Sequence, residues 1–249
     1  MGSIAYDAPK DDSKRAVTIL VTGFGPFQEK YPVNPSWEIA RSLPSALPNA
    51  TADGRPIQII TYGSPIRVCY KDSYELIPPL LEAYSSTIDL VLHIGMASGR
   101  AFYTAERYAH RDGYVKNKDL DGNLPQLDES EDLLKDCPER LETSLGFEKL
   151  LQQWQYTIKH IPATSPAHGA DCRGSDDAGH YLCDYTYRNS MVWYGRTNEM
   201  LEGGKKSDRP VMFLHVPAES DEATLKKGAV VAIALIQAMV DDLIAPDSS

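Results

Sequence analysis

The sequence has few cysteines, and their spacing pairs none of them. The four, Cys69, Cys137, Cys172 and Cys183, are spread through 249 residues without a Cys-x-x-Cys pair. This spacing excludes the common zinc-binding patterns, and it argues against a disulfide framework in a chain of this length. We therefore expect a reducing, cytoplasmic environment.

Long apolar runs and excess positive charge are also missing. The longest apolar run, AVVAIALIQAMV at 229–240, is too short to span a membrane. Residues 1–15 contain no apolar signal core and are predicted to form a flexible polar tail. A formal net charge of -10 argues against binding to nucleic acid or to anionic lipid, since both require a basic surface. We expect neither partner, and the sequence leaves a homo-oligomer open.

Short apolar segments alternate with amphipathic ones along the rest of the chain. Strands are predicted at 17–21, 57–62, 88–94 and 211–216, and helices at 34–43, 70–84, 147–161, 178–193 and 222–244. The Pro78-Pro79 pair should kink or divide the second helix. The alternation predicts one α/β domain over 16–245, a largely parallel twisted sheet with helices on both faces. Its ligand site should lie beyond the carboxyl ends of the strands.

Cys183 lies in SDDAGHYLCDYTYR, residues 175–188, ahead of a run of aromatic residues. Asp176 or Asp177 can cap a helix that starts near Ala178, which would place Cys183 in its first or second turn. Free backbone N–H groups and the helix dipole favour a thiolate there. Free cysteines are also commonly buried as small apolar residues, so position alone leaves both a nucleophile and a packed core residue open.

A thiol nucleophile needs a base, which is usually histidine. His215 ends VMFLHV, the place where an α/β sheet presents catalytic side chains. His180, three residues before Cys183, is a rival base, whereas His93 lies inside a strand and is predicted to be structural. We favour His215, with a hydrogen-bonded core histidine as the alternative.

A carboxylate is needed to orient such a histidine. Glu106 in AFYTAERYAH follows the glycine turn GMASGR and is surrounded by aromatic residues, which is unusual for a solvated surface group. A simple salt bridge to Arg100 or Arg107 is the alternative. In TGFGPF, residues 22–27, the glycines fit neither a P-loop nor GxGxxG. Phe24 and Phe27 could instead line an apolar ring pocket or fill the core.

Four segments together resemble pyroglutamyl-peptidase type I. VTGFGPF followed by VNPSWEIA resembles the opening of that family, and LVLHIGMASGR with TAERYA resembles its glycine turn and catalytic glutamate. DAGHYLCDYTY resembles its nucleophile segment, and FLHVP its histidine segment. Each motif alone is moderately specific, but all four occur in the family's order from Val17 to the last helix.

The resemblance implies a cysteine peptidase that removes an N-terminal pyroglutamyl residue from peptides through a thioester. The family's catalytic Glu, Cys and His fall on Glu106, Cys183 and His215. The implied chemistry needs no metal or organic cofactor, and the implied partners are peptides with a pyroglutamyl N-terminus.

The resemblance also implies a ring pocket formed by Phe24, Phe27, Met96, Tyr181 and Leu182. Met96 stands where many bacterial members have a glutamine that binds the lactam. HRDGYVKNKDLDG replaces the bacterial ARIPDN segment and is closer to animal members. These departures leave two alternatives: a thiol hydrolase for another capped amine or small amide, and a non-catalytic binding homologue.

Overall fold

The structure is a computed structural model that describes residues 15–48, 51, 53–125 and 136–246. Its strands are β1 Val17–Gly23, β2 Ala46–Leu47, β3 Ile57–Thr61, β4 Leu90–Met96, β5 Tyr103–Glu106, β6 Tyr108–His110, β7 Arg140–Glu142, β8 Cys172–Ser175 and β9 Val211–Val216. Its helices are α1 Pro35–Ser42, α2 Tyr70–Tyr84, α4 Phe147–Lys159, α5 Leu182–Thr197 and α6 Glu222–Ile244. The expected N-terminal tail lies almost wholly outside the described residues.

A seven-stranded mixed sheet runs through the middle of the molecule in the order β2-β3-β1-β4-β9-β5-β8. Strands β3, β1, β4 and β9 are mutually parallel, as expected from their continuous apolar sequences. β5 reverses direction and pairs antiparallel with β9, and β8 then pairs parallel with β5. The predicted fold class, a single α/β domain with a largely parallel sheet, is confirmed.

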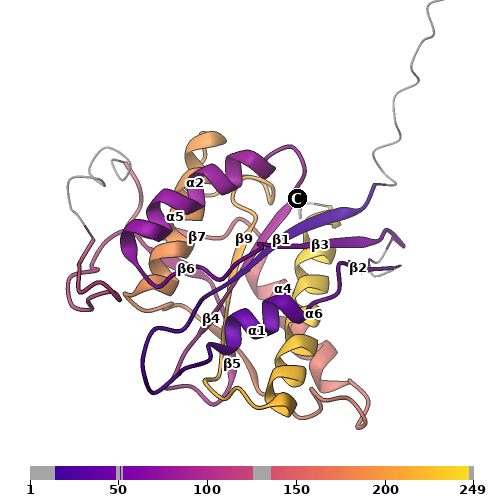
Figure 1. Cartoon of the computed structure of the whole chain (residues 1–249). Coiled ribbons are helices and arrows are strands. Elements are labelled where there is room, and N and C mark those ends of the chain that lie inside the picture. Colours follow the sequence, from indigo (N-terminus) through magenta and orange to yellow (C-terminus); the bar gives the residue numbers. More distant parts are fainter. Residues whose placement is uncertain (1–14, 49–50, 52, 126–135, 247–249) are drawn as a thin grey trace, which may run out of the picture.

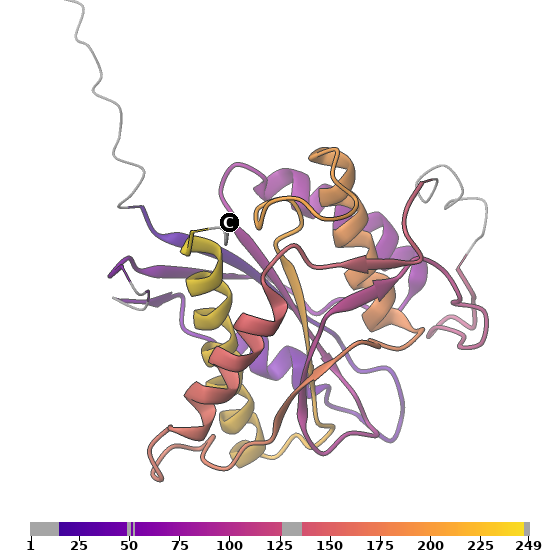
Figure 2. The ribbon, with the colours of Figure 1, turned by 180° about the vertical axis from the view of Figure 1, so that it is seen from behind.

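Helices cover both faces of this sheet (Figures 1 and 2). α1, α4 and α6 pack on one face, where Ile39, Trp154 and Leu235 belong to one buried apolar cluster. α2 and α5 pack on the other face, where Ile77, Tyr187 and Phe213 belong to a second cluster. The sheet thus separates two cores, and the start of α5 points toward the carboxyl ends of β4 and β9.

The structure corrects two helix predictions: the proline pair does not divide α2, and α5 starts later than expected. α2 runs through Pro78 and Pro79 without a break, because its apolar face, including Ile77, packs against α5 and holds it in place. α5 begins at Leu182 and not near Ala178, with Tyr181 as its N-cap. The chain from Asp177 to Tyr181 forms a turn instead, in which Asp177 accepts a hydrogen bond from the Gly179 N–H and Gly179 has a positive φ of 86°.

The short strands β2, β5, β6, β7 and β8 were not predicted, since none has an apolar pattern long enough to recognise. β6 and β7 form a separate two-stranded sheet beside α5. Among the described residues, no helix has both the length and the apolar content required to cross a membrane.

Candidate active site

Cys183 is the second residue of α5, in the first turn of the helix. The N-cap residue, Tyr181, makes no side-chain hydrogen bond to this turn, so the side chain leaves the first backbone N–H groups uncapped. The Cys183 thiol lies directly over Gly95 in β4, where an added Cβ would stand 2.7 Å from Sγ. Gly95 is the strand neighbour of His215 in β9. A glycine at position 95 therefore lets the thiol reach the sheet beside the predicted base.

His215 is buried, with 4% of its surface exposed, and faces a carboxylate. Its Nδ1 lies 2.8 Å from Glu106 Oε1. The pairing of β5 with β9 explains this contact, because Thr104 lies opposite His215 and Glu106 lies opposite Phe213. Residues two apart on a strand share a face, so Glu106 and His215 meet diagonally on one side of the sheet.

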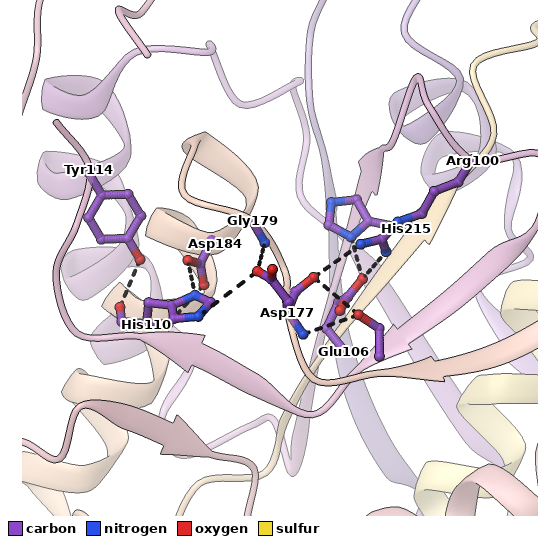
Figure 3. A network of polar contacts seen from close by, with 9 residues as sticks. Arg100, Glu106, His110, Tyr114, Asp177, Gly179, Asp184 and His215 are labelled. Carbon is purple, nitrogen blue, oxygen red and sulfur yellow. Dashed lines mark hydrogen bonds and ion pairs between the residues drawn. The ribbon is translucent and has the colours of Figure 1, made fainter. Parts of the chain in front are cut away.

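Glu106 is fully buried and is held by more than the histidine. Figure 3 shows Arg100 and His215 converging on its carboxylate. Arg100 Nη1 donates to Glu106 Oε1 and also to Thr104 Oγ1, which itself bonds Glu106 at 3.0 Å. Burial acts to raise the pKa of Glu106, but the hydrogen bond and charge of His215, with Ser175 and Arg100, outweigh it and lower the pKa below its ordinary value.

The thiol itself differs from the sequence-based expectation. Burial, with smaller contributions from the charges of Asp184 and Glu106, raises the pKa of Cys183 to about 12. Arg100 and the backbone at Cys183 act in the opposite direction but are weaker. The backbone at the helix start acts to lower the pKa of Cys183, as predicted, but desolvation outweighs this effect in the free protein. No hydrogen bond joins this thiol to His215 within the described part of the chain.

The rival histidines have other surroundings. His180 is exposed and precedes α5, and its ring stacks on His110 with centroids 4.0 Å apart. His110 in turn bonds Asp184 through Nδ1 at 2.8 Å. His93 is fully buried between Thr22 and Ser190, and burial lowers its pKa to about 3. The structure thus brings Glu106 to His215, and it gives His180 and His93 different partners.

The predicted pocket residues fall into two groups. Phe24, Met96 and Leu182 are buried, and the Phe24 ring packs 6.2 Å from that of Phe213. Phe27 and Tyr181 are half-buried, with ring centroids 6.2 Å apart. The Tyr181 hydroxyl donates to the Lys118 carbonyl at 3.2 Å, which connects the start of α5 to the loop after β6. Only the second group has ring surface left for a ligand.

Sequence reasoning missed the double role of Arg100. It treated an Arg100–Glu106 salt bridge as an alternative to catalysis, but the structure shows both Arg100 and His215 on the same carboxylate. Arg100 Nη2 also donates to the Asp177 carbonyl at 3.1 Å, in the turn that precedes Cys183. The arginine at the end of GMASGR was the available signal. The role of Gly95 was also missed, although GMASGR begins with it.

A cavity of about 400 Å³ lies elsewhere, between α2 and α5, lined in part by Pro78, Asn189 and Trp193. None of the predicted site residues lines it. The candidate site residues near the ends of β4, β5 and β9 therefore lie outside this cavity.

Comparison with known proteins finds one consistent group. A family model described as pyroglutamyl peptidase matches residues 17–245. The chain is 29% identical over 211 residues to a pyrrolidone-carboxylate peptidase of Thermosipho africanus, covering 84% of this chain and 85% of the relative. It is 30% identical over 199 residues to pyroglutamyl-peptidase 1 of Mus musculus, covering 80% and 78%.

Solved structures agree in fold. Pyrrolidone carboxyl peptidase of Pyrococcus furiosus superposes with a TM-score of 0.68 at 20% identity, covering 92% of this chain and all of that one. The bacterial and mouse relatives have nearly equal identity to this chain, so they do not separate eukaryotic from bacterial likeness. Since the family model spans almost all of the predicted domain, the chain belongs to the pyroglutamyl peptidase family of cysteine peptidases.

Proposed function

We propose that this protein hydrolyses the bond after an N-terminal pyroglutamyl residue, with Cys183 as nucleophile, His215 as base and Glu106 as the group that orients the base. One observation carries the proposal: the Cys183 thiol sits on Gly95, the strand neighbour of a histidine that is itself bonded to a buried carboxylate. Family membership supplies the substrate class.

The raised thiol pKa determines how the reaction starts. Because Cys183 is a neutral thiol at rest, His215 must take its proton as the sulfur attacks the pyroglutamyl carbonyl. The ionised Glu106 stabilises the resulting imidazolium and fixes the Nδ1 tautomer. Catalytic hydrogen bonds are often long without substrate, so the thiol–imidazole bond is expected to form in the complex.

The oxyanion of the tetrahedral intermediate needs donors. The N–H groups of Leu182 and Cys183, in the uncapped first turn of α5, are suitably placed at the nucleophile. His215 then protonates the leaving amine, and the thioester remains. Water, deprotonated by His215, attacks this thioester, and the returning proton restores the Cys183 thiol as pyroglutamate leaves.

Selection of the lactam is assigned to the half-buried aromatic pair, Phe27 and Tyr181. A pyroglutamyl residue has no charged α-amine, so it can enter an apolar site, whereas an N-terminal glutamine would have to bury an ammonium group there. Peptides with this N-terminus are the proposed partners, and the cytoplasm is the proposed location because the cysteines are free in the structure.

A pair of fluorogenic substrates tests the proposal. Pyroglutamyl-aminomethylcoumarin should be hydrolysed, and prolyl-aminomethylcoumarin, which has a similar ring with a charged nitrogen, should not. Cys183→Ala should abolish hydrolysis while the protein remains folded. Hydrolysis that survives in Cys183→Ala would refute the mechanism. If Cys183 reacts with small electrophiles but the lactam substrate is ignored, the protein is a thiol hydrolase of another capped amine.

Alkylation by iodoacetamide tests the state of the nucleophile. Cys183 should react before the other three cysteines, because they are buried and it is half-buried. Since the thiolate is the reactive form and the pKa of Cys183 is about 12, its alkylation rate should rise about tenfold per pH unit between about pH 7 and pH 9. Peptide mapping gives these rates. A plateau near neutral pH, or faster labelling of Cys69 or Cys172, would contradict the prediction.

A further inference from the structure

A second cluster of polar side chains includes Asp184, the residue that follows Cys183. His110, His180 and Asp184 each offer one ligand atom, and these atoms all lie within 4.8 Å of one another. They come from three segments: the end of β6, the turn before α5, and the first turn of α5. Figure 3 shows His110 and Asp184 of this cluster, separated from Glu106 and His215 by Asp177.

We propose that His110, His180 and Asp184 form a binding site for one divalent ion of the zinc type. Two imidazoles and one carboxylate are a ligand set that Zn²⁺ and Co²⁺ accept, and three protein ligands leave a fourth position for water. Mg²⁺ and Ca²⁺ prefer oxygen ligands and are not expected to bind. The site is additional to the proposed catalytic groups and shares no side chain with them.

Two of the three ligands are already held in place. The Asp184 side chain is fully buried, and its Oδ1 accepts a hydrogen bond from the His110 backbone N–H at 3.0 Å. Its Oδ2 lies 2.8 Å from His110 Nδ1. Ligand atoms on a tetrahedral zinc stand about 3.3 Å apart, given bonds of about 2.0–2.1 Å. An ion therefore has to displace the proton of this hydrogen bond into solvent, and the two atoms must separate by about 0.5 Å.

The third ligand, His180, has to rotate its side chain toward the other two. Its ring stacks on His110 with an interplanar angle of 29°, so the two imidazoles already lie face to face before any ion is bound. The ring also rests against Gly113, where an added Cβ would stand 2.7 Å from His180 Cδ2. Gly113 has a positive φ of 96°, so the space beside the imidazole is kept open by a glycine that its backbone favours. Because His180 is exposed, its side chain can rotate toward Asp184.

An ion at this site would act on the neighbouring nucleophile segment. His180 directly precedes Tyr181, which contacts Phe27, and Cys183 follows two residues later. Holding His180 against α5 would fix the turn that carries Tyr181, so we expect bound zinc to slow hydrolysis reversibly. This consequence rests on the proposed function, whereas binding of the ion does not.

Calorimetric titration with Zn²⁺ alone tests the binding. Cys183→Ser provides the background, because it removes the thiol that could hold zinc together with His215. One saturable site per chain is expected, and adding His180→Gln should weaken it about tenfold or more. His168→Gln, which removes an exposed histidine outside the cluster, is the matched control and should change nothing. Circular dichroism checks that each variant is folded.

Co²⁺ identifies the ligands by its absorption spectrum. The proposed site should give d–d bands without thiolate-to-cobalt charge transfer, and His180→Gln should remove them. Absence of saturable binding, a charge-transfer band from a cysteine ligand, or equal affinity in His180→Gln would each overturn the proposal. If zinc binds as expected but wild-type protein does not hydrolyse pyroglutamyl substrates, only the proposed function fails. If hydrolysis occurs and zinc inhibits wild type and His180→Gln equally, the regulatory consequence fails.

Discussion

Two histidine–carboxylate pairs lie near the segment that carries Cys183, and they share the same contact distance. His215 lies 2.8 Å from Glu106, and His110 lies 2.8 Å from Asp184. Their surroundings differ, because an arginine also binds Glu106. Burial raises the pKa of Asp184 and outweighs the bond from His110. For Glu106, burial acts in the same direction but is overcome by His215, Ser175 and Arg100.

A short histidine–carboxylate contact therefore does not by itself define a catalytic pair. The Glu106 pair is enclosed at the sheet, its carboxylate stays ionised, and its imidazole belongs to the strand next to the thiol. The Asp184 pair adds an exposed second histidine, which suits a ligand site better than a proton relay. Substitutions can separate the two roles.

Removing one histidine from each cluster should give the largest contrast. His215→Ala should lower kcat by a factor on the order of a thousand or more, because the neutral thiol then has no base. His180→Ala should change kcat far less in metal-free buffer. Steady-state hydrolysis of pyroglutamyl-aminomethylcoumarin measures both. The opposite ranking would show that the cluster at α5 holds the base.

Substitution of Arg100 should lower kcat, because Arg100 contacts the Glu106–His215 pair and has no counterpart among the described residues at the His110–Asp184 pair. Arg100→Met should lower kcat by about ten- to a hundredfold with little change in KM, since Arg100 positions Glu106 and does not touch substrate in the proposed mechanism. Arg100 acts to lower the pKa of Glu106. Its removal should therefore raise that pKa and move the acid limb of the kcat profile to higher pH.

Arg100→Lys is the matched variant. It keeps a positive charge near Glu106 but lacks the guanidinium that bonds both Glu106 and Thr104. It should recover part of kcat and part of the acid limb. A role limited to folding would lower the yield of active enzyme without moving the pH profile. That result would contradict a positioning role for Arg100.

Much of this arrangement was predictable from sequence, for physical reasons. The buried strands β1, β4 and β9 have continuous apolar runs, and their carboxyl ends located His215 and the glycine turn. Resemblance to four ordered family motifs proposed Glu106 and Cys183 as site residues. The reversal of β5 was not predictable, because four residues carry too little pattern to show strand direction.

The start of α5, the pKa of Cys183 and the contact between His180 and His110 could not be predicted from the sequence. The helix start at Leu182 depends on a local turn at Asp177 and Gly179, which competes with helix formation. The thiol pKa depends on how deeply the folded chain buries Cys183, and a linear sequence does not contain that quantity. The contact between His180 and His110 joins segments that are 70 residues apart in the chain.

The pocket should respond less strongly than the catalytic groups. Phe27→Ala should raise KM about tenfold, equivalent to about 1.4 kcal/mol, because it removes ring surface that remains available to a ligand. Alkylation of Cys183 should be almost unchanged. Phe24→Ala serves as the contrast: this ring is 2% exposed and packs on Phe213, so its removal should cost about 3–5 kcal/mol of stability. Unchanged KM in Phe27→Ala would refute its place in the ring site.

The smallest expected effect concerns Met96, at the end of β4. Its side chain is 7% exposed, so a glutamine placed there must find a partner for its amide or lose about 1–3 kcal/mol. The lactam of a pyroglutamyl substrate would supply that partner, because its ring amide both donates and accepts. Met96→Gln should therefore retain kcat and lower KM by about threefold or less, while Met96→Leu, which preserves the apolar character, should leave KM unchanged. Thermal unfolding with and without pyroglutamate separates binding from stability: the ligand should stabilise Met96→Gln more than Met96→Leu. If both variants respond equally to the ligand, Met96 does not face the ring, and recognition of the lactam depends on backbone groups near Leu182.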